Sequence, residues 1–434
     1  MVTSFPSRTY INHSSYIFFM KIHCLGAGQE VGRSCFLIET DQRVLFDYGL
    51  KIFSKEGHSK SGMVPIPYEG KLDAMFLSHA HLDHSGYIPE LYSRPPIHWF
   101  ATPPTLEIAS ILWQDSLKLM GEAAPYSEQH MKYAKNNFAP LMYEQLLSLG
   151  DTDYSFHDAG HILGSAMIRA TYKKKHLVYS GDFKTGNTRM HAGASPPDKV
   201  DCLILESTYS NREHPNREEL ESRLIKSITE TLDVGGTVLL PAFAVGRTQE
   251  LLSILNSKLQ DVPIFVDGMG KTISTIYQNN PEYLRDSKEF EDALTRVVFV
   301  QSPSQRREAT NGPAVIVSTA GMMEGGPALS YLQNLSPSSK LIFTGYNVSG
   351  TNGSRILNEH KVRINDVDLE LSVPVEYFDF SAHVGHKGLI EFVKTTNPEK
   401  IILNHGDNTP AFAIELQGMG FDAVAPTNGD VTEF

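Results

Sequence analysis

The chain has 434 residues, of which 41% are hydrophobic and 20% charged, and this balance excludes wholesale disorder, collagen-like repeats and a coiled coil. Asp and Glu outnumber Lys and Arg by 50 to 38, so the formal net charge is −12. The protein therefore lacks the overall positive charge that is typical of proteins that bind nucleic acid through their whole surface. A polyanionic ligand would therefore need a local positive site, and a metal centre is the most compact one.

Cysteine usage and hydropathy set the expected compartment. Cys24, Cys35 and Cys202 are too few and too scattered for a disulfide framework, so we expect reduced thiols and a cytoplasmic location. No run approaches the roughly 18 apolar residues that a membrane helix needs, so we expect no membrane partner. The first strand pattern starts at Met20, and residues 1–19 are expected to be an N-terminal extension without a functional role.

Residues 20 to about 209 show short strand patterns punctuated by glycine. Strands are predicted at residues 21–26, 34–40, 43–49 and 73–78. Helices are predicted over 103–120 and around 131–149, and a hairpin over 167–182 with Lys173, Lys174 and Lys175 at its turn. We expect the three lysines to form a solvated turn.

Beyond about residue 210 the predicted pattern changes to strands that alternate with helices. Helices are predicted over 218–234 and 247–259, and strands at 237–243, 263–268, 296–300, 314–319 and 340–346. This alternation indicates a parallel α/β layer with its own core. After about 358 the pattern returns to strands, with a helix at 385–396 and a strand at 400–407.

The strongest chemical signal is the segment His79-Ala80-His81-Leu82-Asp83-His84, which follows a short apolar strand. Four potential metal ligands fall within six residues, and a tight loop after a strand lets alternate side chains point into one cavity. Imidazoles together with a carboxylate are the ligand set of zinc or a similar borderline ion. The segment therefore predicts a metal site.

Further candidate ligands suggest a second metal ion. Asp47, Asp182 and His405 each end an apolar strand, and His161 lies between small residues in AGHILGSA. A buried polar residue at a strand end is costly without a partner. One such residue would be a capped strand end, but their repetition argues for a shared site.

This constellation resembles the metallo-β-lactamase superfamily, whose motifs occur in this chain order at Asp47, HAHLDH, His161 and Asp182. The region after Asp182 resembles the β-CASP subgroup, which acts on nucleic acids. Its motifs A, B and C match Glu206 in LILESTY, His383 in DFSAHVGH and His405 in LNHGD. The stretches PAFAVGRTQELL, STAGMMEGGP and FTGYNVSGTNGSRIL are also similar to β-CASP signatures.

The resemblance implies an α/β fold, namely an αββα sandwich interrupted by an inserted α/β domain, with the active site in the cleft between them. The expected boundaries are 20–209 and 359–434 for the two parts of the metallo-β-lactamase domain, and 210–358 for the β-CASP domain. Because the ligands come from both parts of the sandwich, the insertion would form a roof over the site.

The resemblance also implies the roles of the site residues and two zinc ions per chain, with manganese or magnesium as other ions. One ion would be held by His79, His81 and His161, the other by Asp83, His84 and His405, with Asp182 bridging both. Asp47 would orient a ligand histidine.

Within the subgroup the match is closest to the RNA-acting branch, because the DNA-acting branch typically has a valine where this chain has His405. The implied reaction is hydrolysis of single-stranded RNA to a 5′-phosphate and a 3′-hydroxyl. His383 would protonate the leaving oxygen with help from Glu206, and Asp83 and Asp182 complete the catalytic set. We expect mainly 5′→3′ exonuclease action with some endonuclease action.

Alternatives remain open at this point: a purely endonucleolytic enzyme, a small-molecule metallohydrolase, or an inactive scaffold subunit. We also expect a homodimer, from the resemblance and from the frequency of two-fold assemblies. The expected substrate-binding residues are Arg247, Ser349, Gly350, Thr351, Arg355 and His386, with Arg306, Arg307, Gly353 and Ser354 as further candidates.

Overall fold

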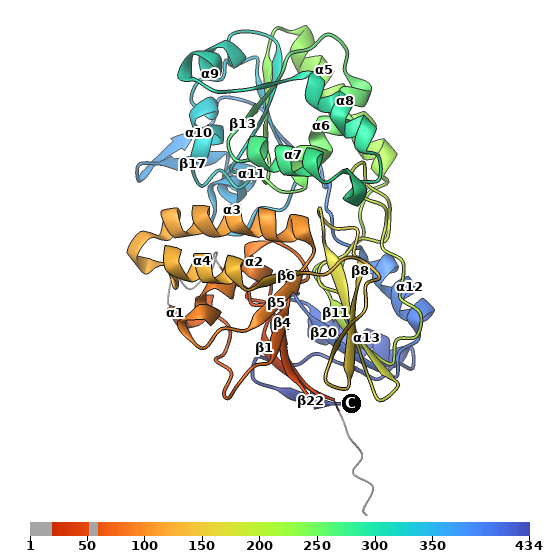
Figure 1. Cartoon of the computed structure of the whole chain (residues 1–434). Helices are drawn as coiled ribbons and strands as arrows, with labels where there is room; N and C mark the ends of the chain where they lie inside the picture. The colour runs from red at the N-terminus through yellow and green to blue at the C-terminus, as the bar shows by residue number, and fades with distance from the viewer. Residues whose placement is uncertain (1–19, 52–59) are drawn as a thin grey trace, which may run out of the picture.

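The computed structural model describes residues 20–51 and 60–434. Residues 1–19, expected to be an extension, lie outside this part. Two facing seven-stranded sheets make the lower body of the molecule, and a third sheet of six strands with its helices lies above them (Figure 1).

The first sheet of the sandwich has the order β22-β1-β2-β3-β4-β5-β6. Its strands are β22 (Val431–Glu433), β1 (Lys21–Gly26), β2 (Cys35–Glu39), β3 (Arg43–Phe46), β4 (Ala74–Phe76), β5 (His98–Ala101) and β6 (Phe138–Pro140). The second sheet has the order β21-β20-β11-β10-β9-β8-β7. Its strands are β21 (Ala423–Val424), β20 (Lys400–Asn404), β11 (Cys202–Glu206), β10 (Lys175–Tyr179), β9 (Ala166–Tyr172), β8 (Thr152–Asp158) and β7 (Leu147–Leu149).

The two sheets bury a shared aromatic core. Phe76 stacks on Tyr154 with ring centroids 4.3 Å apart, and Phe46 stacks on Tyr179 at 6.1 Å. Side chains in a strand alternate between its two faces, and in β8 this alternation places Tyr154 and Phe156 in the buried layer between the sheets. These contacts fix the spacing of the sheets, and so the spacing of the residues at their ends.

Helices cover both outer faces of the sandwich, which gives the αββα order. The first sheet packs against α3 (Pro103–Met120) and α4 (Glu128–Asn136), and the second against α12 (His386–Thr396) and α13 (Thr409–Gly418). Short helices α1 (Lys60–Met63) and α2 (Leu82–Ser85) lie in loops of the first half. The αββα sandwich with an inserted α/β domain, expected from the motif order, is confirmed.

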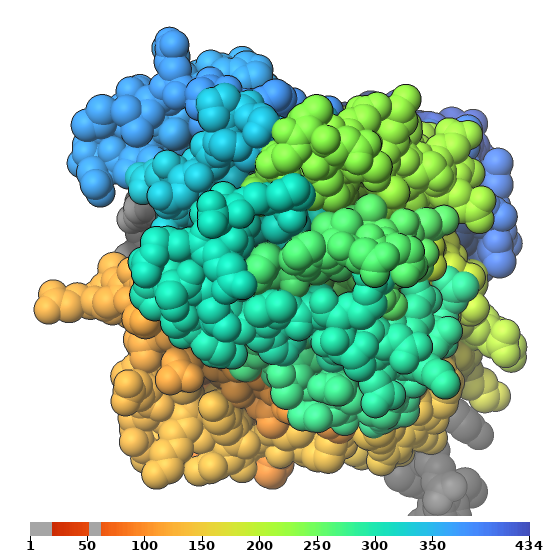
Figure 2. Space-filling view, turned by 90° about the horizontal axis from the view of Figure 1, so that it is seen from above, coloured from red at the N-terminus to blue at the C-terminus, as the bar shows by residue number. Residues whose placement is uncertain are grey.

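The inserted domain has a parallel sheet of order β14-β13-β15-β12-β16-β19. Its strands are β14 (Val297–Phe299), β13 (Ile264–Asp267), β15 (Ala314–Ser318), β12 (Thr237–Pro241), β16 (Lys340–Phe343) and β19 (Val375–Tyr377), and a separate ribbon pairs β17 (Lys361–Ile364) with β18 (Val367–Glu370). Its helices are α5 (Arg217–Asp233), α6 (Arg247–Lys258), α7 (Gly270–Asn279), α8 (Ser287–Thr295), α9 (Pro303–Ala309), α10 (Gly326–Leu332) and α11 (Asn352–Glu359). From above, this domain covers much of the sandwich (Figure 2).

Two sequence-based boundaries differ from the structure. The helix predicted around 131–149 ends at Asn136, and the strands β6 and β7 follow it. Asn137 ends the helix, and Pro140 cannot donate a helical hydrogen bond, so this part of the prediction is wrong. The sheet of the inserted domain also draws on β19, which pairs with β16 beyond the expected boundary at residue 358.

The insertion packs on the sandwich rather than hanging from it. Val245, Ile273 and Tyr277 of the insertion share one hydrophobic cluster with Trp113 of α3. The Tyr277 hydroxyl accepts a hydrogen bond from the backbone N–H of Leu163 at 3.1 Å. Within the described residues, none of the helices has both the length and the apolar character needed to cross a bilayer.

Candidate metal centre

The candidate ligands lie at the carboxyl ends of strands. Strands β10, β11 and β20 are parallel neighbours, so Asp182, Glu206 and His405, which end or follow them, meet at one edge of the second sheet. In the first sheet, the parallel strands β3 and β4 lead to Asp47 and His79. Parallel strands direct their carboxyl ends to the same edge, where α/β folds bind ligands. The order of the strands therefore brings residues that are far apart in the sequence to the same edge of the sandwich.

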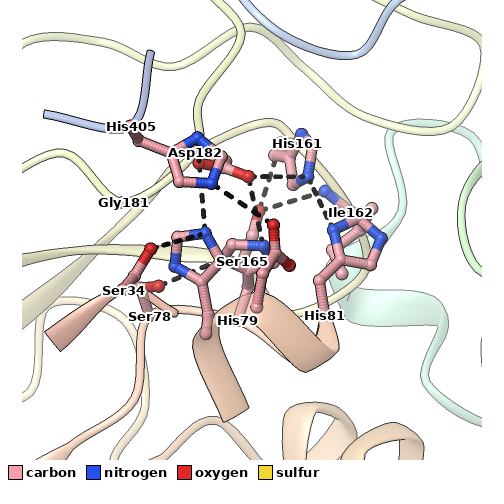
Figure 3. Close-up of polar contacts among 12 residues, drawn as sticks. Ser34, Ser78, His79, His81, His161, Ile162, Ser165, Gly181, Asp182 and His405 are labelled. Atoms are coloured by element: carbon pink, nitrogen blue, oxygen red, sulfur yellow. Dashed lines mark hydrogen bonds and ion pairs between the residues drawn. The ribbon is translucent and has the colours of Figure 1, made fainter. Parts of the chain in front are cut away.

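The side chains from these strand ends converge on one point. Figure 3 shows His79, His81, His161, Asp182 and His405 directed toward one another. Ligand atoms of His79, His81, His161 and Asp182 all lie within 4.8 Å of one another. In two further sets the ligand atoms also lie within 4.8 Å of one another: Asp83, His84 and His405 form one set, and Asp182, Glu206 and His383 form the other.

Asp47 fixes the orientation of His84. The carboxylate is fully buried and accepts hydrogen bonds from the Ser78 backbone N–H, the Ser78 hydroxyl and the Tyr179 hydroxyl, each at 2.7 Å. It also accepts a bond from His84 Nδ1 at 2.6 Å. With Nδ1 engaged, the ring of His84 presents Nε2 toward Asp182 at 3.3 Å.

In His79 and His161, as in His84, Nδ1 lies beside a hydrogen-bond partner. Nδ1 of His79 lies 3.0 Å from the Ser78 hydroxyl, and Nδ1 of His161 lies 3.0 Å from the carbonyl of Ala382. When acceptors hold the Nδ1 proton, Nε2 keeps its lone pair, which is how proteins prepare a histidine for a metal ion. His79 Nε2 is buried and has no hydrogen-bond partner among the described residues.

Asp182 stands between the two sets of ligand atoms. Its Oδ1 lies 3.3 Å from His84 Nε2 and 3.5 Å from His405 Nδ1. Its Oδ2 lies 3.5 Å from His79 Nε2 and 3.8 Å from His161 Nε2. Oδ1 is buried and makes no hydrogen bond within the described part of the chain. A buried carboxylate oxygen without a donor is costly, and a cation would remove that cost.

The pKa shifts of His79, His161 and Asp182 suit cation binding. Burial lowers the pKa of His79 and of His161 well below the usual value, so both rings are neutral at pH 7 and can donate a lone pair. Burial alone would raise the pKa of Asp182, but the surrounding histidines, His405 first, hold it well below its usual range. The residues present therefore fit a divalent metal centre of nitrogen and carboxylate donors.

His383 lies beside this cluster and is paired with Glu206. Its Nδ1 is 3.1 Å and 3.2 Å from the two oxygens of Glu206, and 4.0 Å from Asp182 Oδ2. Glu206 is itself held by the backbone N–H of Phe183 at 3.1 Å. Burial would lower the pKa of His383, but Glu206 and then Asp182 outweigh burial and raise it to about 9.

Several supporting residues were not predicted from the sequence. Tyr179 and Ser78 hold Asp47, the Thr208 hydroxyl lies 3.1 Å from His405 Nδ1, and Lys184 donates to the carbonyl of His383 at 2.8 Å. Each lies within a few residues of a motif position, and this proximity is the only signal in the sequence. Their partners are set by tertiary packing.

Arg247 begins α6, and the glycine before it approaches the chain neighbour of His161. An added Cβ on the preceding Gly246 would lie 3.0 Å from Ile162, the neighbour of His161. Burial, together with the nearby Arg217, lowers the pKa of Arg247 to about 10. Its Nε is buried without a hydrogen-bond partner in residues 20–51 and 60–434.

The other expected substrate-binding residues are engaged within the protein or lie on a turn. Arg355 makes two 2.8 Å bonds to Asp368. His386 donates Nδ1 to the carbonyl of Ser210 at 2.6 Å, and its Nε2 is 3.1 Å from Glu415. Thr351 caps α11 through its hydroxyl, while residues 349–350 form an exposed turn just before it. Arg306 pairs with Asp267 at 2.6 Å.

Two protein families match the sequence. Residues 248–356 match the Beta-Casp domain, which falls within the inserted part of the fold. Residues 368–426 match the Zn-dependent metallo-hydrolase RNA specificity domain, which includes His383 and His405. The second match covers the segment that leads from the insertion back to the sandwich.

Similar proteins are found among archaea. Probable RNase MJ4 of Methanocaldococcus jannaschii is 36% identical, over 95% of this chain and 99% of that protein. RNase aCSPSF2 of Saccharolobus solfataricus is 33% identical, over 95% and 84% respectively. Transcription termination factor FttA of Methanothermobacter thermautotrophicus is 34% identical, over 89% and 67%. A crystal structure of a protein of unknown function from Enterococcus faecalis shares the fold, with a TM-score of 0.65, 13% identity and coverage of 96% and 100%.

Proposed function

Since this chain belongs to the β-CASP ribonucleases of the metallo-β-lactamase superfamily and is a metal-dependent ribonuclease, we propose that it uses two zinc ions to hydrolyse single-stranded RNA from the 5′ end. The observation that carries this proposal is the position of Asp182, whose two oxygens face two separate sets of ligand atoms. One ion would leave one of these sets without a partner.

The proposed ligand sets follow this geometry. His79, His81 and His161 would hold one ion, while Asp83, His84 and His405 would hold the other, and Asp182 lies within reach of both sets. Asp47 acts through His84 by holding its ring. Divalent ions bound here would acidify a water molecule and neutralise the charge of the phosphate. Zinc suits the imidazole-rich donor set, and manganese or magnesium is the alternative.

His383 is proposed as the general acid. Its ring is held by Glu206 at 3.1 Å and reaches within 4.0 Å of Asp182, so it borders the centre. From there it delivers a proton to the leaving 3′ oxygen, and hydrolysis leaves a 5′-phosphate and a 3′-hydroxyl. Glu206 keeps the ring in place, and the Lys184 bond to the His383 carbonyl supports the same loop.

Arg247 is proposed to bind the terminal 5′-phosphate. The buried Arg247 Nε and the buried hydroxyl of Thr344 both lack hydrogen-bond partners in the described part of the chain. A terminal monophosphate carries more charge than an internal diester, so an arginine whose Nε lacks a partner among the described residues favours it. Ser349, Gly350 and Thr351 remain candidates for backbone or hydroxyl contacts with the strand, and Arg355 and His386 remain candidates that also hold partners within the protein.

The domain limits follow from the chain path. We propose that the sandwich comprises residues 20–209 together with the segment after β19, and that the β-CASP insertion runs from 210 through β19. The roof formed by this insertion would admit a single strand more readily than a duplex. The homodimer and the cytoplasmic location expected from the sequence stay predictions.

Digestion of end-labelled RNA tests the proposed direction. Single-stranded RNA with a 5′-monophosphate should release labelled mononucleotides from the 5′ end, and 5′-triphosphate RNA should be degraded more slowly because the terminal phosphate site is occupied by a larger group. The products are separated on a sequencing gel against single-stranded DNA of identical sequence.

Two results of this digestion would contradict the proposal. Internal fragments from circular or triphosphate RNA at the same rate as from monophosphate RNA would mean an endonuclease, which is the alternative. Equal cleavage of DNA would remove the assignment of RNA as the preferred substrate.

A further inference from the structure

Two exposed aromatic residues follow neighbouring strands of the inserted sheet. Phe243 comes two residues after β12, and Tyr346 comes three residues after β16, which pairs with β12. A Cβ added to Gly345 would lie 3.2 Å from the ring of Phe243 and 4.0 Å from Arg247 Nε. Phe243 and Arg247 therefore both approach Gly345, which precedes Tyr346 in the chain, at the carboxyl end of a parallel sheet.

These rings have no role in the core. Phe243 is 38% exposed and Tyr346 is 53% exposed. Among the described side chains, no aromatic ring or cation stacks on either of them. Single exposed apolar residues are ordinary, but two exposed aromatic residues on adjoining loops, near an arginine whose Nε lacks a hydrogen-bond partner among the described residues, form a surface with ligand-binding character.

Buried polar atoms around Gly345 also lack partners. Besides Arg247 Nε, the Thr344 hydroxyl and Asn347 Oδ1 are buried and make no hydrogen bond to any described residue. Thr344 is itself fully buried. Unpaired buried donors and acceptors are rare in folded proteins, and here they fall on the loop that carries Tyr346 and on Arg247, which approaches the same loop at Gly345.

The surface lies next to the reacting centre. Gly246, three residues after Phe243, approaches Ile162, which follows His161. A strand whose phosphate reaches the metal centre would therefore pass this surface.

We propose that Phe243 and Tyr346 form a stacking platform for an unpaired nucleobase of the RNA substrate, with Arg247 on the adjoining phosphate. Every base has a flat apolar face, so an aromatic ring binds it without regard to sequence. A base in a duplex is stacked and paired, and so it cannot occupy the platform. This inference rests on the proposed function and adds the determinant that selects single strands.

The test combines a variant with single abasic residues placed at successive positions of a 5′-monophosphate RNA. Phe243→Leu should weaken binding of intact RNA by roughly 5- to 100-fold, the range for loss of one stacked base. One abasic position should weaken binding to the wild-type protein by a similar factor and should cause no further loss in Phe243→Leu. Phe243→Tyr keeps a ring and should retain binding. Tyr133→Leu, an exposed aromatic on α4 away from the platform, is the matched control.

The outcomes separate this inference from the proposed function. If the wild-type protein cleaves RNA but binds every abasic RNA as tightly as intact RNA, the platform is refuted while the ribonuclease assignment stands. Full binding by Phe243→Leu, or an abasic effect that persists unchanged in that variant, also overturns the platform. If Phe243→Leu does not fold, unequal binding by Phe243→Tyr and wild type would count against it, whereas equal binding together with the abasic effect in both would support it. A wild-type protein that neither binds nor cleaves RNA refutes the proposed function and this inference together.

Discussion

Asp182→Asn is expected to abolish RNA cleavage, with a loss of roughly 10³-fold or more, because one neutral amide replaces the carboxylate that faces both sets of ligand atoms. The substitution preserves shape, and the aromatic core of the sandwich does not involve Asp182, so the fold should survive. Metal content should fall with activity. Elemental analysis and a single-turnover cleavage assay measure the two effects, and circular dichroism reports the fold.

Asp198→Asn is the matched control for this variant, because Asp198 is an exposed aspartate in the loop that follows Asp182. It should keep both metal content and rate. If Asp182→Asn keeps two metal ions per chain and cleaves at the wild-type rate, Asp182 is not the shared ligand and the two-ion arrangement is wrong.

His383→Ala is expected to lower the cleavage rate by about 10²–10⁴-fold while keeping both metal ions and RNA affinity. The reason is that His383 borders the centre, held by Glu206, without belonging to either proposed ligand set. Glu206→Gln should show a smaller loss, since the ring remains but its carboxylate partner is gone. Rates, metal content and RNA affinity are measured on the same preparations.

A substrate with sulfur at the leaving 3′ position supplies the sharper test of His383. A thiolate leaves with less need for a proton, so this RNA should partly restore the rate of His383→Ala. It should not restore the rate of Asp182→Asn, whose defect lies in the metal centre. Equal failure to rescue both variants would mean that His383 positions the substrate or a metal ion instead.

The metal centre is the part of the molecule that the sequence predicts best. Its residues stand at the ends of apolar strands, and strand order brings those ends together whatever the lengths of the loops between them. His79 and His405 are more than 300 residues apart along the chain, yet both follow buried strands of facing sheets. The local sequence pattern and the sheet topology therefore both place these residues at one site.

Residues whose roles depend on a specific partner could not be predicted in this way. The two bonds from Arg355 to Asp368 come from the pairing of α11 with the β17–β18 ribbon, which no local pattern specifies. The pairing of His386 in α12 with Glu415 in α13 likewise depends on how the two helices pack. The helix expected to continue to 149 was wrong because apolar spacing around Leu146 fits either a helix or a strand, and tertiary pairing of β7 with β8 decides it.

The measurement that tests the central claim most directly is a metal titration of metal-free protein, followed by the rate of cleavage of single-stranded RNA. The chain is depleted with a chelator, zinc is added in known equivalents, and bound metal is counted at each point. Activity should be absent without metal and should rise until two ions are bound per chain. Saturation of activity at one bound ion, or cleavage that persists in fully depleted protein, would contradict the two-metal account.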